Sequence, residues 1–158
     1  MFALPTAWDS ASASAAAVPH AVYVLRLRQG KYYVGKTAGK SVSTRFREHE
    51  LGQGSAWTRL HPPDRVVEAL EALSHHQSLF FETLLTCQYC FVYGLDHVRG
   101  SFFCKTAPDF YEKKAFCSVI AHHLEREFEE VERRLLKTGR AGGSSVLVPF
   151  GDRTNRNT

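Results

Sequence analysis

The 158-residue chain has no apolar run near the length of about 20 residues that a membrane-spanning helix needs. Its first residues lack the basic start and apolar run of a secretory signal peptide, and they lack the arginines of a mitochondrial transit peptide. No internal repeat is visible. We therefore expect an intracellular protein of a reducing compartment, nuclear or cytoplasmic, with no membrane partner.

Cysteine is also scarce, with only Cys87, Cys90, Cys104 and Cys117. Without a secretory signal, this number favours reduced thiols over a disulfide framework. Cys87 and Cys90 form a C-x-x-C pattern, but they fall within a predicted helix and the other two cysteines lack such a pairing. Helical cysteines at this spacing are often simply buried apolar residues. The pattern does not favour a structural zinc site.

The two ends of the chain differ in composition from its middle. Residues 1–19 hold seven alanines, three serines and one charge, and residues 139–158 are rich in Gly, Ser, Asn and Arg, so we expect two disordered tails. The stretch VLVPF in the second tail fits an untethered segment, a short docked strand or a partner-binding segment. Between the tails we expect one domain at residues 20–107 and a long helix at residues 108–138 that packs on it or extends it.

Apolar periodicity and turn residues predict the secondary structure. Residues 21–27 and 31–37 are rich in β-branched and aromatic side chains and predict two strands joined by the short turn at residues 28–30. Helices are expected at residues 41–52, 76–94 and 108–138, and loops at residues 52–64 and 95–100. Residues 65–73 fit either a further strand or a helix. The order predicts an α/β fold with a small antiparallel sheet, flanking helices and a long C-terminal helix.

Basic residues are concentrated in one part of the chain. Residues 21–65 contain nine Lys and Arg against three Asp and Glu, whereas residues 66–100 contain one arginine against four acids. A basic block of this kind fits a polyanionic partner, of which nucleic acid is the commonest. It also fits a charged surface that keeps the domain soluble.

Residues 30–37, GKYYVGKT, match the pattern G-x-x-x-x-G-K-[ST] of a phosphate-binding P-loop. A P-loop must turn its backbone N–H groups toward a phosphate and lead directly into a helix. Here the middle residues Lys-Tyr-Tyr-Val are bulky and strand-forming, and Gly39 lies where the helix should continue. We therefore interpret the segment as a strand and reject the P-loop.

Two tripeptides lie on the predicted hairpin, AVY at residues 21–23 and YVG at residues 33–35. The next helix carries RFREH, with Arg45 and His49 one turn apart, and a later helix carries LFFETLL, with Glu82 among apolar residues. This ordered set resembles the GIY-YIG nuclease superfamily, with Tyr23 and Tyr33 at the positions of its two tyrosines.

Residues 93–103, YGLDHVRGSFF, add a second similarity. They resemble the YG-x-D-N-VRGG box of a stand-alone branch of the same superfamily, with His97 and Ser101 in place of Asn and Gly. Ala21 likewise replaces the first Gly of the family. The resemblance extends from about His20 to Gly100, half of the chain.

The resemblance implies an activity and a set of site residues. It implies an endonuclease that hydrolyses phosphodiester bonds in DNA with Mg²⁺ or Mn²⁺, and it leaves branched DNA and RNA open as substrates. Glu82 would be the metal ligand, because hard oxygen donors suit these cations, and Arg45 would bind a phosphate oxygen. Tyr23 would be the general base that takes a proton from the attacking water, with Tyr33 and His49 assisting.

Two further basic residues, Lys36 and Arg59, are candidates for contact with nucleic acid. Lys36 follows the second tripeptide directly, and Arg59 lies in a predicted loop whose sequence WTRLHPPD resembles the DNA-facing loop of some family members. Both residues also fit ordinary surface charge. Trp57 in the same loop fits either a core residue or a platform on which a base stacks.

Two other functions fit the same sequence. The first is a nucleic-acid-binding module of the same fold that lacks catalysis, which the replacements Ala21 and His97 favour. The second is a helical interaction protein in which residues 108–138 self-associate or bind a protein partner. The acid-rich stretch LEREFEEVERR within that helix would repel DNA and therefore faces protein or solvent.

Overall fold

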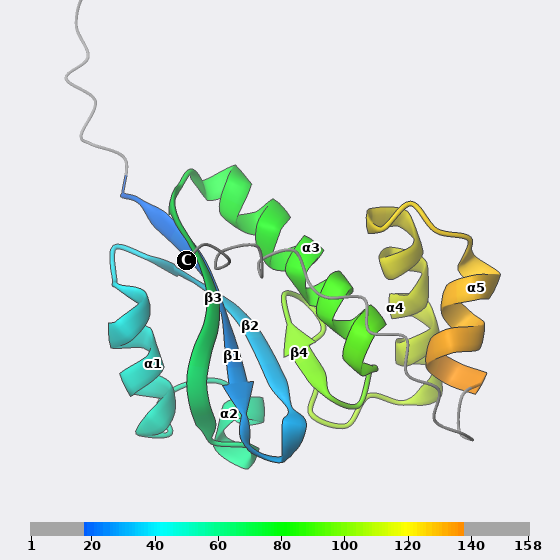
Figure 1. Ribbon diagram of the computed structural model, residues 1–158, viewed down its shortest axis with the longest axis horizontal. Helices are drawn as coiled ribbons and strands as arrows, with labels where there is room; N and C mark the ends of the chain where they lie inside the picture. The colour runs from blue at the N-terminus through cyan, green and yellow to red at the C-terminus, as the bar shows by residue number, and fades with distance from the viewer. Residues whose placement is uncertain (1–17, 138–158) are drawn as a thin grey trace, which may run out of the picture.

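The computed structural model describes residues 18–137, which form a sheet covered by helices on both faces (Figure 1). Residues 1–17 and 138–158 lie outside this range, and the predicted tail disorder and the VLVPF segment lie there with them. Three of the four strands precede α3, so the site residues of the N-terminal half sit on or beside the sheet.

Four strands form a mixed sheet in the order β3-β1-β2-β4 (Figure 1). Strands β1 (His20–Leu27) and β2 (Tyr32–Ala38) form the predicted hairpin, and β1 also pairs antiparallel with β3 (Pro63–Leu73). Residues 65–73 are therefore a strand, one of the two alternatives that the sequence left open.

The fourth strand, β4 (Val98–Gly100), pairs with β2 in parallel. The prediction of a purely antiparallel sheet is therefore wrong at this edge. The loop predicted at residues 95–100 is confirmed for residues 95–97 and wrong for residues 98–100. Three residues are too few to show a strand pattern, and they form a strand because β2 offers them hydrogen-bond partners. The pairing ends at Val34, so β4 leaves the edge of β2 open from Gly35 onward.

Two helices follow the hairpin. Helix α1 (Val42–Glu50) begins where predicted, because the Ser41 hydroxyl accepts a hydrogen bond from the Thr44 N–H at 3.1 Å and caps it. Helix α2 (Ala56–Leu60) is a single short turn in the region predicted as a loop. Its apolar content is too small for a periodic signal, but Ser55 caps it in the same way as Ser41 caps α1.

The C-terminal half is helical. Helix α3 (His75–Tyr93) matches the prediction and begins with a capping box. The single long helix predicted at residues 108–138 is wrong, because the chain forms α4 (Phe110–His123), α5 (Phe128–Glu132) and a π-helical turn (Arg133–Lys137). Glu125 has φ of 52°, a left-handed conformation that ends α4 and turns the chain so that α5 lies beside it (Figure 1).

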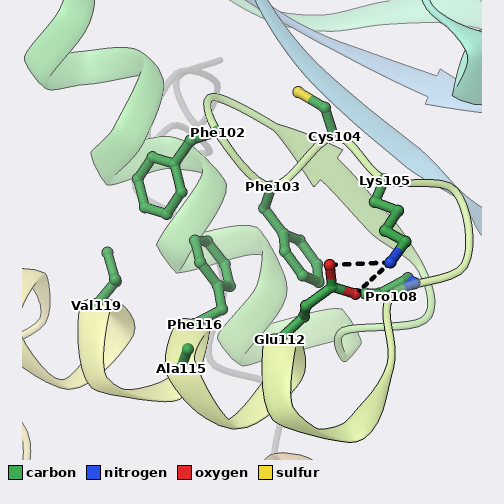
Figure 2. A pocket seen from close by; sticks show the side chains of 9 residues that line it. All are labelled: Phe102, Phe103, Cys104, Lys105, Pro108, Glu112, Ala115, Phe116 and Val119. Atoms are coloured by element: carbon green, nitrogen blue, oxygen red, sulfur yellow. Dashed lines mark hydrogen bonds and ion pairs between the residues drawn. The ribbon is translucent and has the colours of Figure 1, made fainter.

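The alternation of side chains along β1 divides the core into two layers. Val22 and Val24 face α3 in the larger cluster, which also contains Phe116 and Val131 of the C-terminal helices. Phe116 stacks on Phe103 with ring centroids 4.3 Å apart (Figure 2). The opposite face of β1 carries Tyr23 against α1 and α2. The apolar pattern that suggested one long helix thus reflects two segments packed into one core.

Arg99 of β4 ties together the loops on both sides of this strand. Its side chain is 2% exposed and donates to four backbone carbonyls, at 2.5–3.0 Å, which belong to Leu95, Val98, Lys105 and Thr106. The guanidinium also lies over the Trp57 ring, 4.4 Å from its centroid. Trp57 is 4% exposed and donates to the Tyr32 carbonyl, so it is a core residue and not a free stacking platform.

Arg99→Lys should lower the free energy of unfolding by about 2–4 kcal/mol, because a lysine cannot reach four carbonyls from one buried position. Urea unfolding measures this value. The matched control is Arg65→Lys, an exposed arginine of β3, which should change stability by no more than about 0.5 kcal/mol. Equal effects of the two substitutions would contradict the role given to Arg99.

Candidate active site

Tyr23 and His49 form a buried hydrogen-bonded pair between the sheet and α1. Tyr23 lies in the middle of β1 and is 0% exposed, and His49 lies in the last turn of α1 and is 1% exposed. The Tyr23 hydroxyl and His49 Nε2 are 3.0 Å apart. The structure therefore brings together two residues that the sequence analysis placed in one site.

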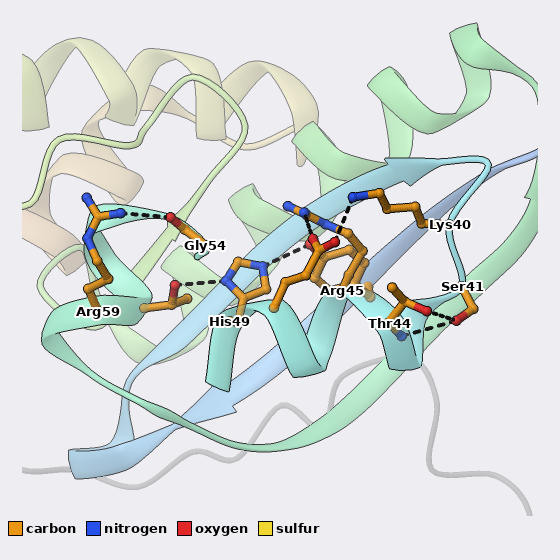
Figure 3. A network of polar contacts seen from close by, with 10 residues as sticks. Lys40, Ser41, Thr44, Arg45, His49, Gly54 and Arg59 are labelled. Atoms are coloured by element: carbon orange, nitrogen blue, oxygen red, sulfur yellow. Dashed lines mark hydrogen bonds and ion pairs between the residues drawn. The ribbon is translucent and has the colours of Figure 1, made fainter. Parts of the chain in front are cut away.

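The second ring nitrogen of His49 determines which atom of the pair is the donor. His49 Nδ1 is 2.8 Å from Thr58 Oγ1, and Thr58 Oγ1 donates to the Ser55 carbonyl at 3.0 Å. Because the Thr58 hydroxyl has one hydrogen and uses it on Ser55, Nδ1 must carry a proton and donate it to Thr58. Nε2 is then the free acceptor, so the Tyr23 hydroxyl donates to it. Figure 3 shows a contact on each side of the His49 ring.

Burial keeps both members of the pair uncharged. It lowers the pKa of His49 to about 4, and the nearby Arg45 charge acts in the same direction. Burial also raises the pKa of Tyr23, while a hydrogen bond with Arg45 and its charge oppose that rise. At neutral pH the pair is thus a phenol that donates to a neutral imidazole with an available lone pair.

Tyr33 of β2 completes an aromatic cluster around His49. The two ring centroids are 5.0 Å apart, and burial together with the neighbouring Tyr23 raises the pKa of the Tyr33 hydroxyl. Gly35 lies opposite Tyr23 in the hairpin register. A Cβ at Gly35 would lie 2.7 Å from Tyr33 Cε1 and 2.8 Å from the Tyr23 hydroxyl oxygen, so only glycine leaves room for both rings.

Gly54 does the same for His49 on the other side. A Cβ there would lie 1.9 Å from His49 Nδ1. Gly54 and Thr58 were both missed at the sequence level. Their signal is weak, because Gly54 is one of several glycines in a predicted loop, and the Ser-x-x-Thr sequence that caps α2 reveals a turn without its tertiary partner.

Arg45 lies one turn before His49 on α1 and forms an ion pair with Glu48. Glu48 also accepts from Lys40 at 2.6 Å, and these hydrogen bonds, that of Lys40 above all, lower the pKa of the Glu48 carboxyl (Figure 3). The Arg45 side chain is 25% exposed, so it contacts the buried pair and still reaches the surface. A guanidinium has five N–H donors, which leaves several for a further anion.

Glu82 of α3 is 8% exposed, and one of its oxygens accepts a hydrogen bond from Lys36 of β2 at 2.8 Å. The Glu82 charge raises the pKa of both Tyr23 and Tyr33, so the carboxylate lies within electrostatic reach of both hydroxyls. Lys36 and Glu82 meet at the part of β2 that follows the end of β4 pairing. The site therefore wraps around this open edge and draws residues from both faces of the sheet.

The remaining candidates play smaller parts. Arg59 of α2 is exposed and donates to the Gly54 carbonyl at 3.0 Å, which supports the loop over His49 (Figure 3). Lys36 and Thr37 lie within β2, and the next helix begins only at Val42, so the P-loop match is an accident, as the sequence analysis concluded.

The cysteines are free thiols, three of them buried and Cys104 exposed. Across residues 18–137, no group of three or more His, Cys, Asp or Glu side chains is arranged to hold a metal ion. A cation at this site would thus have Glu82 as its one carboxylate ligand, with water and substrate oxygens completing its shell.

Comparisons with protein-family models, with curated proteins and with solved structures gave no match to this chain. The similarity to the GIY-YIG superfamily is therefore a resemblance of sequence motifs alone. None of the helices within the described range is long and apolar enough to cross a membrane.

Gly35→Ala should displace the Tyr23 and Tyr33 rings and lower stability by about 1–3 kcal/mol, because the added methyl overlaps both. NMR chemical shifts of the two rings and of His49 report the displacement. Gly30→Ala is the control, since Gly30 has φ of 67° but no atom within 4 Å of an added Cβ. It should cost stability through backbone strain alone and leave the three ring signals in place. Unchanged ring signals in Gly35→Ala would contradict close packing of the two tyrosine rings against Gly35.

The burial of neutral His49 also predicts a pH dependence of stability. The folded pKa is about 4 and the unfolded value is about 6.5, so the unfolded chain binds the extra proton first as pH falls. The free energy of unfolding should therefore fall between pH 6.5 and pH 4, by up to a few kcal/mol. Urea unfolding of the wild type and His49→Gln isolates this component, because His61 and His97 remain in both. An identical pH slope in the two proteins would contradict a buried neutral His49.

Proposed function

We propose that this chain is a GIY-YIG-type endonuclease that hydrolyses phosphodiester bonds in DNA with Mg²⁺ or Mn²⁺. The observation that carries the proposal is the buried Tyr23–His49 hydrogen bond with Arg45 and Glu82 in electrostatic reach. A tyrosine that only fills a core needs no such set of partners. Proton transfer, anion binding and metal binding by adjacent side chains are what phosphodiester hydrolysis requires.

The hydrogen-bond direction gives Tyr23 a neighbour that can take its proton while Tyr23 acts as a base. A free phenol titrates near pH 10 and, with burial raising its pKa, Tyr23 holds almost no phenolate at neutral pH. As Tyr23 takes a proton from the attacking water, it can pass its own proton to His49 Nε2. Thr58 holds His49 in the tautomer that can accept this proton. Tyr23 then relays a proton without becoming a stable anion. Because burial and the Arg45 charge lower the pKa of His49 to about 4, the protonated His49 is a short-lived state that gives its proton up again within the turnover.

Arg45 is the residue best suited to bind a phosphate oxygen. Its ion pair with Glu48 fixes one side of the guanidinium, and its partial exposure leaves other N–H groups within reach of a ligand. Its charge also favours transient negative charge on Tyr23, because it lowers the pKa of that hydroxyl. Lys40, bound to Glu48, adds positive charge on the same side.

Glu82 fits a divalent cation. Its oxygens are hard donors, Lys36 binds Oε2, and Oε1 has no hydrogen-bond partner among the residues that the structure describes. A single protein carboxylate completed by water and a substrate phosphate is a normal Mg²⁺ arrangement. A cation bound there would neutralise charge on the phosphate and assist the departing oxygen.

A second candidate function is nucleic-acid binding without catalysis. The observation that favours it is the Lys36–Glu82 ion pair, because a site that no longer binds a cation needs a counter-charge for a buried carboxylate. His97 takes the place of the Asn in the family box. Its backbone carbonyl accepts a hydrogen bond from the Tyr32 N–H at 2.7 Å, and this contact does not depend on the side chain at position 97. Binding through the C-terminal helices has less support, because Phe116, Ile120 and Val131 pack in the core.

Incubation with Mg²⁺ or Mn²⁺ and with linear duplex, branched and single-stranded DNA, and RNA, tests the proposal. The wild type should cleave DNA, and Glu82→Gln and Arg45→Ala should each reduce cleavage at least 100-fold, since each removes charge stabilisation at the phosphate. Glu129→Gln on α5 and Arg65→Ala on β3 are the matched controls and should cleave like the wild type.

Cleavage that persists in both Glu82→Gln and Arg45→Ala would overturn the site assignment. Salt-sensitive DNA binding with no cleavage by the wild type would instead select the binding module.

A further inference from the structure

A cavity of about 250 Å³ lies between the segment after β4 and the first turns of α4 (Figure 2). Its walls are mainly apolar and include Phe102, Phe103, Phe116 and Val119. The Phe102 side chain is 62% exposed beside this cavity, so its ring is accessible to a ligand. The cavity has the size of one planar ring system and is below the range usual for larger ligands.

The rim of the cavity is polar. The Lys105 ammonium and the Glu112 carboxylate form an ion pair there, with contacts of 2.9 and 3.0 Å (Figure 2). Together they offer hydrogen-bond donors and an acceptor beside the aromatic walls. The edge of a nucleobase presents the complementary combination of acceptor and donor groups, and its faces stack on aromatic rings.

The same segment connects the cavity to the candidate active site. Thr83, which follows Glu82 on α3, shares a hydrogen bond with Ser101 through their hydroxyls at 2.9 Å. Cys104 lies between the two sites. It is part of the cavity lining, and its thiol points away from the phenylalanines in Figure 2. The Glu82 charge raises the pKa of this thiol and the Lys36 charge lowers it, so both side chains are nearby. The cavity therefore lies on the Glu82 side of the candidate site, next to the segment that contacts α3.

We propose that the cavity is a binding site for one unpaired nucleobase of the DNA strand that is bound at the active site. This inference rests on the proposed function and adds a substrate class to it, namely DNA with an unpaired nucleotide beside the scissile phosphate. A base inside a duplex cannot present its face to Phe102 because its neighbours cover it. A flap, a bulge or a junction with an unstacked base supplies the exposed face.

The test uses duplex DNA with one unpaired 2-aminopurine, whose fluorescence responds to stacking, and a duplex in which the same base is paired. All binding measurements use the full chain with Glu82→Gln, so that cleavage plays no part. This protein should bind the bulged DNA about tenfold more tightly than the paired DNA and should change the fluorescence of the unpaired base. Adding Phe102→Ala should remove both effects, because one base–aromatic stack accounts for a loss of this size.

Phe110→Ala is the matched control, because Phe110 is 56% exposed and lies outside the cavity lining. It should keep the tenfold preference. Ala115→Phe places a ring in the cavity from an exposed position and should abolish the preference without removing any aromatic wall.

Equal binding of the two DNAs by the parent protein, or a fluorescence change that Phe102→Ala leaves intact, would overturn the inference. Cleavage by the wild type decides the proposed function separately. A protein that cleaves paired and bulged DNA equally well would keep its nuclease function and lose this base-binding site.

Discussion

The hydrogen bond from the Tyr23 hydroxyl to His49 Nε2 is the interaction on which the rest of the site depends. It joins the middle of the sheet to the last turn of α1 and fixes the position of Arg45 one turn earlier. Both groups are buried, so an unpaired hydroxyl or imidazole there would cost stability. Gly35 and Gly54 provide the space for the two rings, and Thr58 fixes the histidine tautomer. The short helix α2 and two glycines thus accommodate one polar pair in this part of the fold.

The open edge of β2 explains how residues on two faces of the sheet act together. β4 pairs with β2 only as far as Val34. The next residue, Gly35, pairs with β1 on one side and has no strand on the other side. As a glycine, it also has no side chain to cover this edge. Glu82 reaches this edge from α3 and meets Lys36, while the tyrosines reach it from the other face. Arg99 maintains the arrangement, since it holds the loops around β4 through four carbonyls. The segment that follows β4 then leads directly to the cavity beside Phe102.

Local signals in the sequence predicted the hairpin, α1 and α3, because their periodicity and serine caps are strong. They did not predict β4, whose strand character comes from its neighbour, or the turn at Glu125, where an ordinary residue adopts a left-handed conformation. The order of the motifs grouped five candidate site residues, and the structure shows contacts or electrostatic coupling among them. They are Tyr23, Tyr33, Arg45, His49 and Glu82. The Thr58 contact and the Lys36–Glu82 ion pair join residues 9 and 46 positions apart and have no local signature.

The central claim is that one site combines the Tyr23–His49 pair with a cation bound at Glu82. Mn²⁺ broadens the NMR signals of nuclei close to it. A titration with sub-stoichiometric Mn²⁺, observed by NMR, therefore locates the cation directly. Signals of Glu82, Lys36 and the Tyr23 and Tyr33 rings should broaden first, and Glu82→Gln should abolish the effect. Broadening centred on other residues, or the same broadening in Glu82→Gln, would contradict the claim.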